Sequence, residues 1–332
     1  MAEYKGVLVL AEAADDKLST ATVELIGCGR KLADDLSEDL HTILLGNGIT
    51  NLAQLAISFG ADRVYTIHNP LLKDYVNGSY TQAMEGAAKQ IMPRIILIGH
   101  TAIGRDLAPS LAFRLGTTAT TDCIELAIEP NSRQLLQTRP VYGGNALATF
   151  TSDCYPQIAT VRAKAYPPAE PDTSRQGEVI AIDAKLEPPK VKFLERVYQV
   201  EEGIRLEDAA VVVAGGRGIG SADGFKQLEE LANLFNGAVG ATRPPCDNGW
   251  IASSAQIGLT GKIVAPDLYL AVAISGSSQH TSGCSGAKNI VAINKDPEAN
   301  IFRAAHYGIV GDWKKVLPAF TERIKDLISG KP

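Results

Sequence analysis

The chain has 332 residues, of which 45% are hydrophobic and 21% are charged, and its formal net charge at pH 7 is −5. This length exceeds one small core, so two domains are expected, with the composition of a soluble globular protein. The acidic balance argues against nucleic acid and against anionic membrane surfaces as partners.

The sequence gives little indication of a targeting segment, a membrane span, a disulfide framework or a metal site. The N-terminal sequence has no basic segment followed by a long apolar core, so we read no signal peptide, and no apolar run suits a membrane-spanning helix. The five cysteines are widely spaced, and none belongs to a CxxC motif or a Cys/His cluster. They predict reduced thiols in a cytoplasmic protein, with neither a disulfide framework nor a metal site.

The first hundred residues alternate apolar strands with amphipathic helices. Strands are expected at 7–10, 42–45, 63–67 and 94–98, and helices at 18–36, 52–59 and 75–91. This alternation predicts βαβ units in a parallel sheet with helices on both faces. The turn at 99–106 contains glycine and precedes a helix, but it lacks the ending of a Walker motif. We favour a structural loop there, with His100 as a loop or interface residue.

Residues 119–161 differ in kind, because β-forming runs follow one another with only turn signals between them. Strands are expected at 124–128, 135–138, 146–150 and 157–161. They predict an antiparallel extension of the first domain, and 179–182 is expected as one more edge strand. A proline-rich, charged stretch then places the linker at about 184–207, between a first domain of 1–190 and a second of 205–332.

The second domain again alternates strands, at 209–214, 238–241, 268–274 and 290–293, with helices, at 224–235 and 313–328. This pattern predicts a doubly wound sheet, in which ligands bind beyond the carboxyl ends of the strands. The small polar turn 275–280 lets backbone N–H groups approach an anion there. Arg217 follows another strand end and can pair with a pyrophosphate, although its GGRGIG run is not the GxGxxG fingerprint. Arg243 precedes two prolines that fix its backbone.

Several motifs, in a fixed order, resemble the electron transfer flavoprotein α subunit. They are VLAEA, IGHTAIGRDLAPSLAFRLGT and TRPVYGGNALAT in the first domain, and AGGRG, GATRPP, QIGLTGK, ISGSSQH, VAINKDPEANIF and YGIVGD in the second. The resemblance covers nearly the whole chain. It implies an FAD-binding second domain, a first domain that has lost a nucleotide-binding role, and a homologous β subunit as obligate partner.

The resemblance also implies roles for individual residues. Arg217, Gln279 and the 275–278 backbone would hold the pyrophosphate and ribityl chain. Asn294 and His306 would meet the adenosine end, while Arg243, Thr260 and His280 would surround the isoalloxazine ring. The full implied set is Arg217, Thr242, Arg243, Gln256, Ile257, Gly258, Leu259, Thr260, Ser275, Gly276, Ser277, Ser278, Gln279, His280, Asn294 and His306. No acid, base or nucleophile is expected, because the flavin carries the electrons.

Two positions depart from the family pattern, and one run leans toward a subgroup. Leu259 stands where many members have Gln, which removes a polar contact near the flavin. His306 stands where members usually have Asp, which removes a carboxylate that would accept a hydrogen bond from ribose or adenine. The run TRPVYGGN is similar to that of members that bifurcate electrons from NADH with a second FAD in the β subunit. The sequence leaves open whether that subunit holds FAD or AMP.

The expected function is therefore electron transfer between dehydrogenases, such as acyl-CoA dehydrogenases, and an acceptor. Other classes remain open from the residues alone. The doubly wound domain resembles a domain of thiamine-diphosphate enzymes and that of NAD-dependent deacylases, although the zinc cysteines of the latter are missing. A binding module that uses the flavin domain as a scaffold is a third possibility. A visible spectrum of the protein purified with its partner distinguishes these classes.

Overall fold

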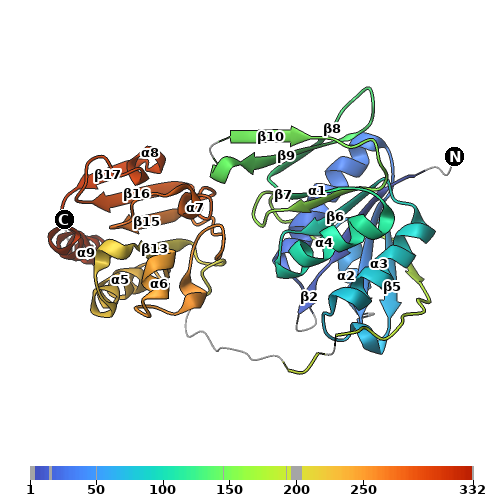
Figure 1. Ribbon diagram of the computed structural model, residues 1–332, viewed down its shortest axis with the longest axis horizontal. Coiled ribbons are helices and arrows are strands. Elements are labelled where there is room, and N and C mark those ends of the chain that lie inside the picture. The colour runs from blue at the N-terminus through green and yellow to red at the C-terminus, as the bar shows by residue number, and fades with distance from the viewer. Residues whose placement is uncertain are drawn as a thin grey trace. The chain divides into compact units, whose positions relative to one another are not determined.

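A computed structural model describes residues 4–14, 17–49, 51–144, 146–191, 193–195 and 204–330. It divides the chain into two compact units, each a sheet with helices packed on it (Figure 1). The first unit contains 1–141 and 147–196, and the second contains 142–146 and 197–332. The predicted linker includes residues 192 and 196–203, which lie outside the described residues.

A seven-stranded, all-parallel sheet forms the centre of the first unit, in the order β12-β5-β4-β1-β6-β11-β7. Its strands are β1 (Val7–Ala11), β4 (Leu40–Gly46), β5 (Arg63–His68), β6 (Ile95–Gly99), β7 (Ala119–Cys123), β11 (Gln157–Val161) and β12 (Glu178–Ala181). Every residue of β1, β4, β6 and β11 is buried. Burial on both faces explains why these strands are mostly apolar instead of alternating; the polar side chains His41, Thr42, Gln157 and Thr160 are buried in β4 and β11.

Helices cover both faces of this sheet, as the alternation predicted. They are α1 (Thr20–Leu36), α2 (Leu52–Ser58), α3 (Asn77–Ile91) and α4 (Ala102–Leu115), with a 3₁₀ turn at Pro70–Leu72. Val7 and Val9 pack in one core cluster with α1 and α2, whereas Leu8 and Leu10 pack in another with α3 and α4. Successive residues of a strand point to opposite faces, so one strand serves both cores.

The antiparallel extension exists but is smaller than predicted. Its strands are β8 (Glu125–Ile128), β9 (Leu135–Val141) and β10 (Ala146–Phe150), in the order β10-β9-β8. The expected strand at 157–161 does not belong to it, because β11 lies between β6 and β7 in the parallel sheet. A short apolar run does not reveal the direction of its neighbours, and only tertiary pairing corrects this expectation. The short β2 (Ala13–Ala14) and β3 (Lys17–Leu18) pair with each other, and a 3₁₀ turn spans Tyr142–Gly144.

The second unit is a five-stranded parallel sheet in the order β14-β13-β15-β16-β17. Its strands are β13 (Val211–Gly215), β14 (Ala238–Ala241), β15 (Leu268–Val272), β16 (Asn289–Asn294) and β17 (Tyr307–Val310). Its helices are α5 (Ala222–Leu234), α6 (Arg243–Asp247), α7 (Ser278–Thr281), α8 (Ile301–Ala304) and α9 (Trp313–Ile328), with 3₁₀ turns at Arg217–Ile219 and Ser253–Ala255. The strand β17 was not predicted; it is an exposed edge strand with a glycine in it.

The observed class is therefore α/β in both units, with a doubly wound second sheet, as predicted. The strand order of the second sheet reverses between β13 and β15. In open α/β sheets a ligand crevice lies at such a switch point, beyond the carboxyl ends of the two strands. No helix in the described part of the chain has the length and apolar character needed to span a bilayer.

Candidate functional site

The loops that follow the central strands of the second sheet form one continuous edge. The N–H of Gly216, just after β13, donates to the carbonyl of Val272 at the end of β15 over 2.9 Å. The N–H of Ala273 donates in turn to Ile293 of β16 over 2.8 Å. These bonds place the turns that contain Arg217 and Ser275 side by side at the switch point.

Two glycines allow these loops to approach so closely. A Cβ atom on Gly216 would lie 2.1 Å from the carbonyl oxygen of Ala273. A Cβ atom on Gly276 would lie 2.1 Å from the backbone nitrogen of Ile301, and the φ of Gly276 is +82°. Both contacts are with backbone, which cannot move aside, so any larger residue displaces the loop.

The turn after β15 presents a row of backbone donors. Within the described chain, the N–H groups of the five successive residues 275–279 have no hydrogen-bond partner. The exposed Arg217 likewise forms no ion pair with any residue that the structure describes. Successive unbonded amide N–H groups with an arginine on the neighbouring turn suit an anion such as a phosphate group.

A third loop, residues 256–262, flanks this turn. It is joined to β14 by the bond from the N–H of Ile257 to the carbonyl of Ala241, 2.8 Å long. The Gln256 side chain donates to the Thr260 hydroxyl over 2.9 Å. The N–H of Leu259 donates to the carbonyl of Gln279 over 2.7 Å, so this loop and the 275–280 turn form one wall. The Leu259 side chain is half exposed.

His280 belongs to this wall but points inward. Its ring lies between the Tyr269 hydroxyl, 2.9 Å from Nε2, and the Ile257 carbonyl, 3.0 Å from Nδ1. Only 4% of its surface is exposed. Burial lowers the pKa of His280 to about 4, so the imidazole is neutral at pH 7. Both ring nitrogens are therefore already bonded within the chain, which the sequence could not reveal.

Arg243 stands at the mouth of the site, at the end of β14. The prolines after it occupy the first turn of α6, where a missing N–H costs nothing, and buried Thr242 precedes the helix. The Arg243 side chain is 68% exposed, and its Nε lies 3.2 Å from an oxygen of Asp247 one turn along. The arginine is thus fixed at its backbone but free at its tip to meet a ligand.

The two residues expected near the adenosine end lie apart. Asn294 ends β16, and its side chain donates to the carbonyl of Ile274 over 2.8 Å. His306 precedes β17, and its Nδ1 accepts from the N–H of Ile290, at the amino end of β16. Four strand residues, or about 13 Å, separate the two positions, so the structure does not bring His306 to this edge. Asp312, two residues beyond β17, does lie at the carboxyl end, and a polar residue just after an apolar run is the signal that would have found it.

The first sheet has a switch point too, between β1 and β6, but an acidic side chain occupies it. The Thr101 hydroxyl donates to the Glu12 carboxylate over 2.6 Å at the start of α4. Burial raises the pKa of Glu12 above its usual range. A Cβ atom on Gly104 would lie 1.8 Å from the Gly99 carbonyl, so the turn is closed. His100 bonds to Thr160 over 2.8 Å. The predicted structural loop fits this arrangement.

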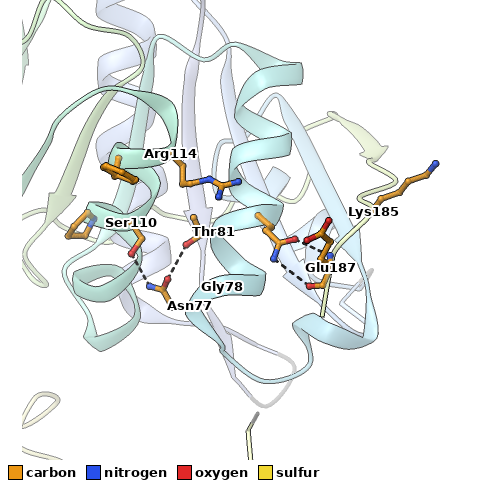
Figure 2. Close-up of a pocket in the computed structure, with 10 residues that line it drawn as sticks. Asn77, Gly78, Thr81, Ser110, Arg114, Lys185 and Glu187 are labelled. Atoms are coloured by element: carbon orange, nitrogen blue, oxygen red, sulfur yellow. Dashed lines mark hydrogen bonds between the residues drawn. The ribbon is translucent and has the colours of Figure 1, made fainter. Parts of the chain in front are cut away.

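A groove of about 750 Å³ lies elsewhere in the first unit, between α3 and α4. Figure 2 shows Asn77 pointing toward Ser110 and Thr81, and both contacts are hydrogen bonds. Across the groove, the Gln82 side chain bonds to the backbone of Glu187. These amides are satisfied by the chain itself, whereas the N–H groups of residues 275–279 have no partner among the described residues.

The comparisons with known proteins agree with the motifs. Residues 7–187 match the electron transfer flavoprotein domain, and residues 205–285 match the electron transfer flavoprotein FAD-binding domain. The electron transfer flavoprotein subunit alpha of Thermoanaerobacterium thermosaccharolyticum is 46% identical over 98% of this chain and all of that protein. The subunit alpha of Megasphaera elsdenii is 43% identical over 98% of each chain. Protein FixB of Clostridium saccharobutylicum is 39% identical over 100% of this chain and 99% of that protein.

Fold, motifs and relatives thus agree over nearly the full length. The thiamine-diphosphate, deacylase and scaffold alternatives have no such support. The chain belongs to the electron transfer flavoprotein α-subunit family, and its second unit is the FAD-binding domain of that family.

Proposed function

We propose that FAD lies along the carboxyl edge of the second sheet, with its pyrophosphate on the amides of 275–279 and on Arg217. The observation that carries this proposal is that, among the described residues, five successive N–H groups at the switch point and the guanidinium of Arg217 on the neighbouring turn have no bonding partner. A pyrophosphate is an anion that needs several converging donors, so this donor set fits it. Bound FAD supplies the electron chemistry, while the protein supplies binding and electrostatics.

The other residues at the carboxyl edge of the second sheet are assigned to parts of FAD according to their position along that edge. The mouth at Thr242 and Arg243, together with the loop 256–260, would border the isoalloxazine ring. Gln279 would face the ribityl chain. Asn294 holds two loops together, and with Asp312 it would border the adenosine end. His280 lies behind this surface, and His306 is left out of the proposed site because it lies at the other end of β16.

The protein would act with a β subunit as its partner. Two of the relatives are named as α subunits, and two apolar side chains of the edge strand β10, Leu147 and Phe150, are 61% and 44% exposed. We propose that the complex takes electrons from an acyl-CoA dehydrogenase or a similar dehydrogenase, in the cytoplasm, where the free cysteines stay reduced. Electron bifurcation from NADH by the same complex is a second form of this proposal, and only the TRPVYGGN run supports it.

Arginine-to-alanine substitution tests the proposed site. The complex of chain and β subunit is stripped of FAD and titrated with it. Arg217→Ala should raise the dissociation constant about tenfold, because a charge-assisted hydrogen bond to phosphate is lost. Arg205→Ala is the matched control: Arg205 is an exposed arginine of the same unit, paired with Asp208, before the amino end of β13. Equal affinities for both variants and the wild type would refute the proposed pyrophosphate site.

A further inference from the structure

Behind the wall of the proposed flavin site runs a buried chain of hydrogen bonds. The Tyr269 hydroxyl on β15 meets His280 Nε2 at 2.9 Å, and His280 Nδ1 meets the Ile257 carbonyl at 3.0 Å. Tyr269 is 0% exposed and Ile257 2%. Bulk water is excluded from these bonds, and the Cys284 thiol is the one further side chain that contacts the Tyr269 hydroxyl among the described residues.

The chemistry of the three groups fixes the direction of both bonds. A carbonyl oxygen can only accept, so Nδ1 of His280 carries the proton and donates to Ile257. In the neutral ring Nε2 then has a lone pair, and the Tyr269 hydroxyl must donate to it. Burial keeps this assignment, since it lowers the pKa of His280 and raises that of Tyr269.

The Ile257 carbonyl belongs to the loop that borders the proposed isoalloxazine position. Beyond it, Gly258 has a φ of +143°, and its Cβ would lie 2.7 Å from the Gln279 carbonyl. The N–H of Leu259 donates to that same carbonyl. The loop therefore follows the 275–280 turn closely, and a shift of Ile257 would carry residues 258–260 with it.

We propose that Tyr269 is a positioning residue of this site. Its hydroxyl orients His280, His280 holds the Ile257 carbonyl, and this clamp fixes the surface that residues 258–260 present to the cofactor. His280 then acts on the flavin through the loop, because neither ring nitrogen has a free N–H. The inference rests on the proposed function for what the loop faces, whereas the clamp itself is a property of the chain.

The test uses the complex with the β subunit and four variants. Tyr269→Phe removes only the hydroxyl. His280→Asn places an amide N–H where Nδ1 lies, and His280→Gln places one where Nε2 lies. Tyr166→Phe is the matched control, since it removes a hydroxyl that accepts from the N–H of Leu126 in the first unit. Hydrogen exchange of the amides of 257–262 is measured without FAD, and the FAD dissociation constant and first-electron potential are measured with it.

Tyr269→Phe should speed amide exchange in the loop and raise the FAD dissociation constant about three- to tenfold, the cost of one buried hydrogen bond. Tyr166→Phe should leave both unchanged. His280→Asn should keep slow exchange and a near-native potential, whereas His280→Gln should not.

The proposal is overturned if Tyr269→Phe changes neither exchange nor affinity. It is also overturned if His280→Gln keeps the potential and His280→Asn loses it, which would make Nε2 a direct donor to the flavin. Failure of every protein, wild type included, to bind FAD would refute the proposed function, while exchange without FAD would still decide the clamp.

Discussion

At the scale of single residues, the edge of the second sheet contains two kinds of side chain. Arg217 and Arg243 extend outward, with guanidinium groups available to a ligand. Asn294 and His280 turn back, and their polar atoms bond to the backbone of neighbouring loops. Sequence and family resemblance predict a flavin contact for both kinds. The hydrogen-bond distances show that Asn294 and His280 already bond within the chain, whereas the two guanidinium groups remain available to a ligand.

The redox role of Arg243 can be tested with its own ion pair. Arg243→Ala should lower the potential of the first electron step, because a positive charge near the ring favours added negative charge. The guanidinium is exposed, so the change should be only roughly 10–40 mV, the range of a solvent-screened pair. Asp247→Asn is the control with opposite sign, since it removes the acid 3.2 Å from Arg243. A redox titration with no difference between either variant and the wild type would remove Arg243 from the electrostatics of the site.

At the scale of elements, the short loops after the strands, more than the strands themselves, determine whether the edge of a sheet is open to a ligand. Both sheets follow the same plan, in which parallel strands end at a glycine-containing turn and a helix begins. In the first unit, Thr101 caps α4 and bonds to Glu12, which fills the switch point. In the second, the turn after β15 leaves its amides open to a ligand. The same kind of turn is thus closed in one unit and open in the other.

Alanine substitution of two glycines in the second unit tests how much the close approach of its loops contributes to the cost in stability. Gly220 and Gly276 have similar φ values, +89° and +82°, but only Gly276 has a backbone atom where a Cβ would lie. Gly220→Ala should therefore cost about 1 kcal/mol of stability, the conformational term alone. Gly276→Ala should cost about 3 kcal/mol, since steric overlap adds to that term. Thermal unfolding without FAD, followed by FAD titration, checks both; equal losses would show that Ile301 moves aside freely.

At the scale of the whole molecule, the chain is two α/β units with different tasks. The second unit has the donors for a cofactor. The first has a closed switch point and an antiparallel sheet whose edge strand β10 exposes apolar side chains. A unit with a closed switch point and an apolar sheet edge is suited to assembly, and this fits the proposed β-subunit partnership.

Paired substitutions at two edge strands test that assembly. Leu147→Ser on β10 should weaken binding of the β subunit about tenfold, because a large apolar side chain is lost from the interface. Val179→Ser on β12 is the control: Val179 is 46% exposed on β12, which is an edge strand of the other sheet of this unit, the seven-stranded one. Association is measured by titrating the labelled β subunit. Equal effects of the two substitutions would exclude β10 as the interface, and a wild-type chain that transfers electrons fully as a monomer would contradict the partnership itself.

The sequence by itself determined the alternation of strands and helices, the α/β class and the family, because buried parallel strands and glycine-rich turns leave a strong local pattern. It also predicts where a ligand binds, since the carboxyl ends of parallel strands share one edge. Only the tertiary structure decided that β11 joins the parallel sheet, that His306 lies about 13 Å from Asn294, and that His280 is bonded to Tyr269 and Ile257. These facts depend on strand pairing and on contacts between residues distant in sequence, and no local pattern records which partner a buried strand or a buried imidazole will meet.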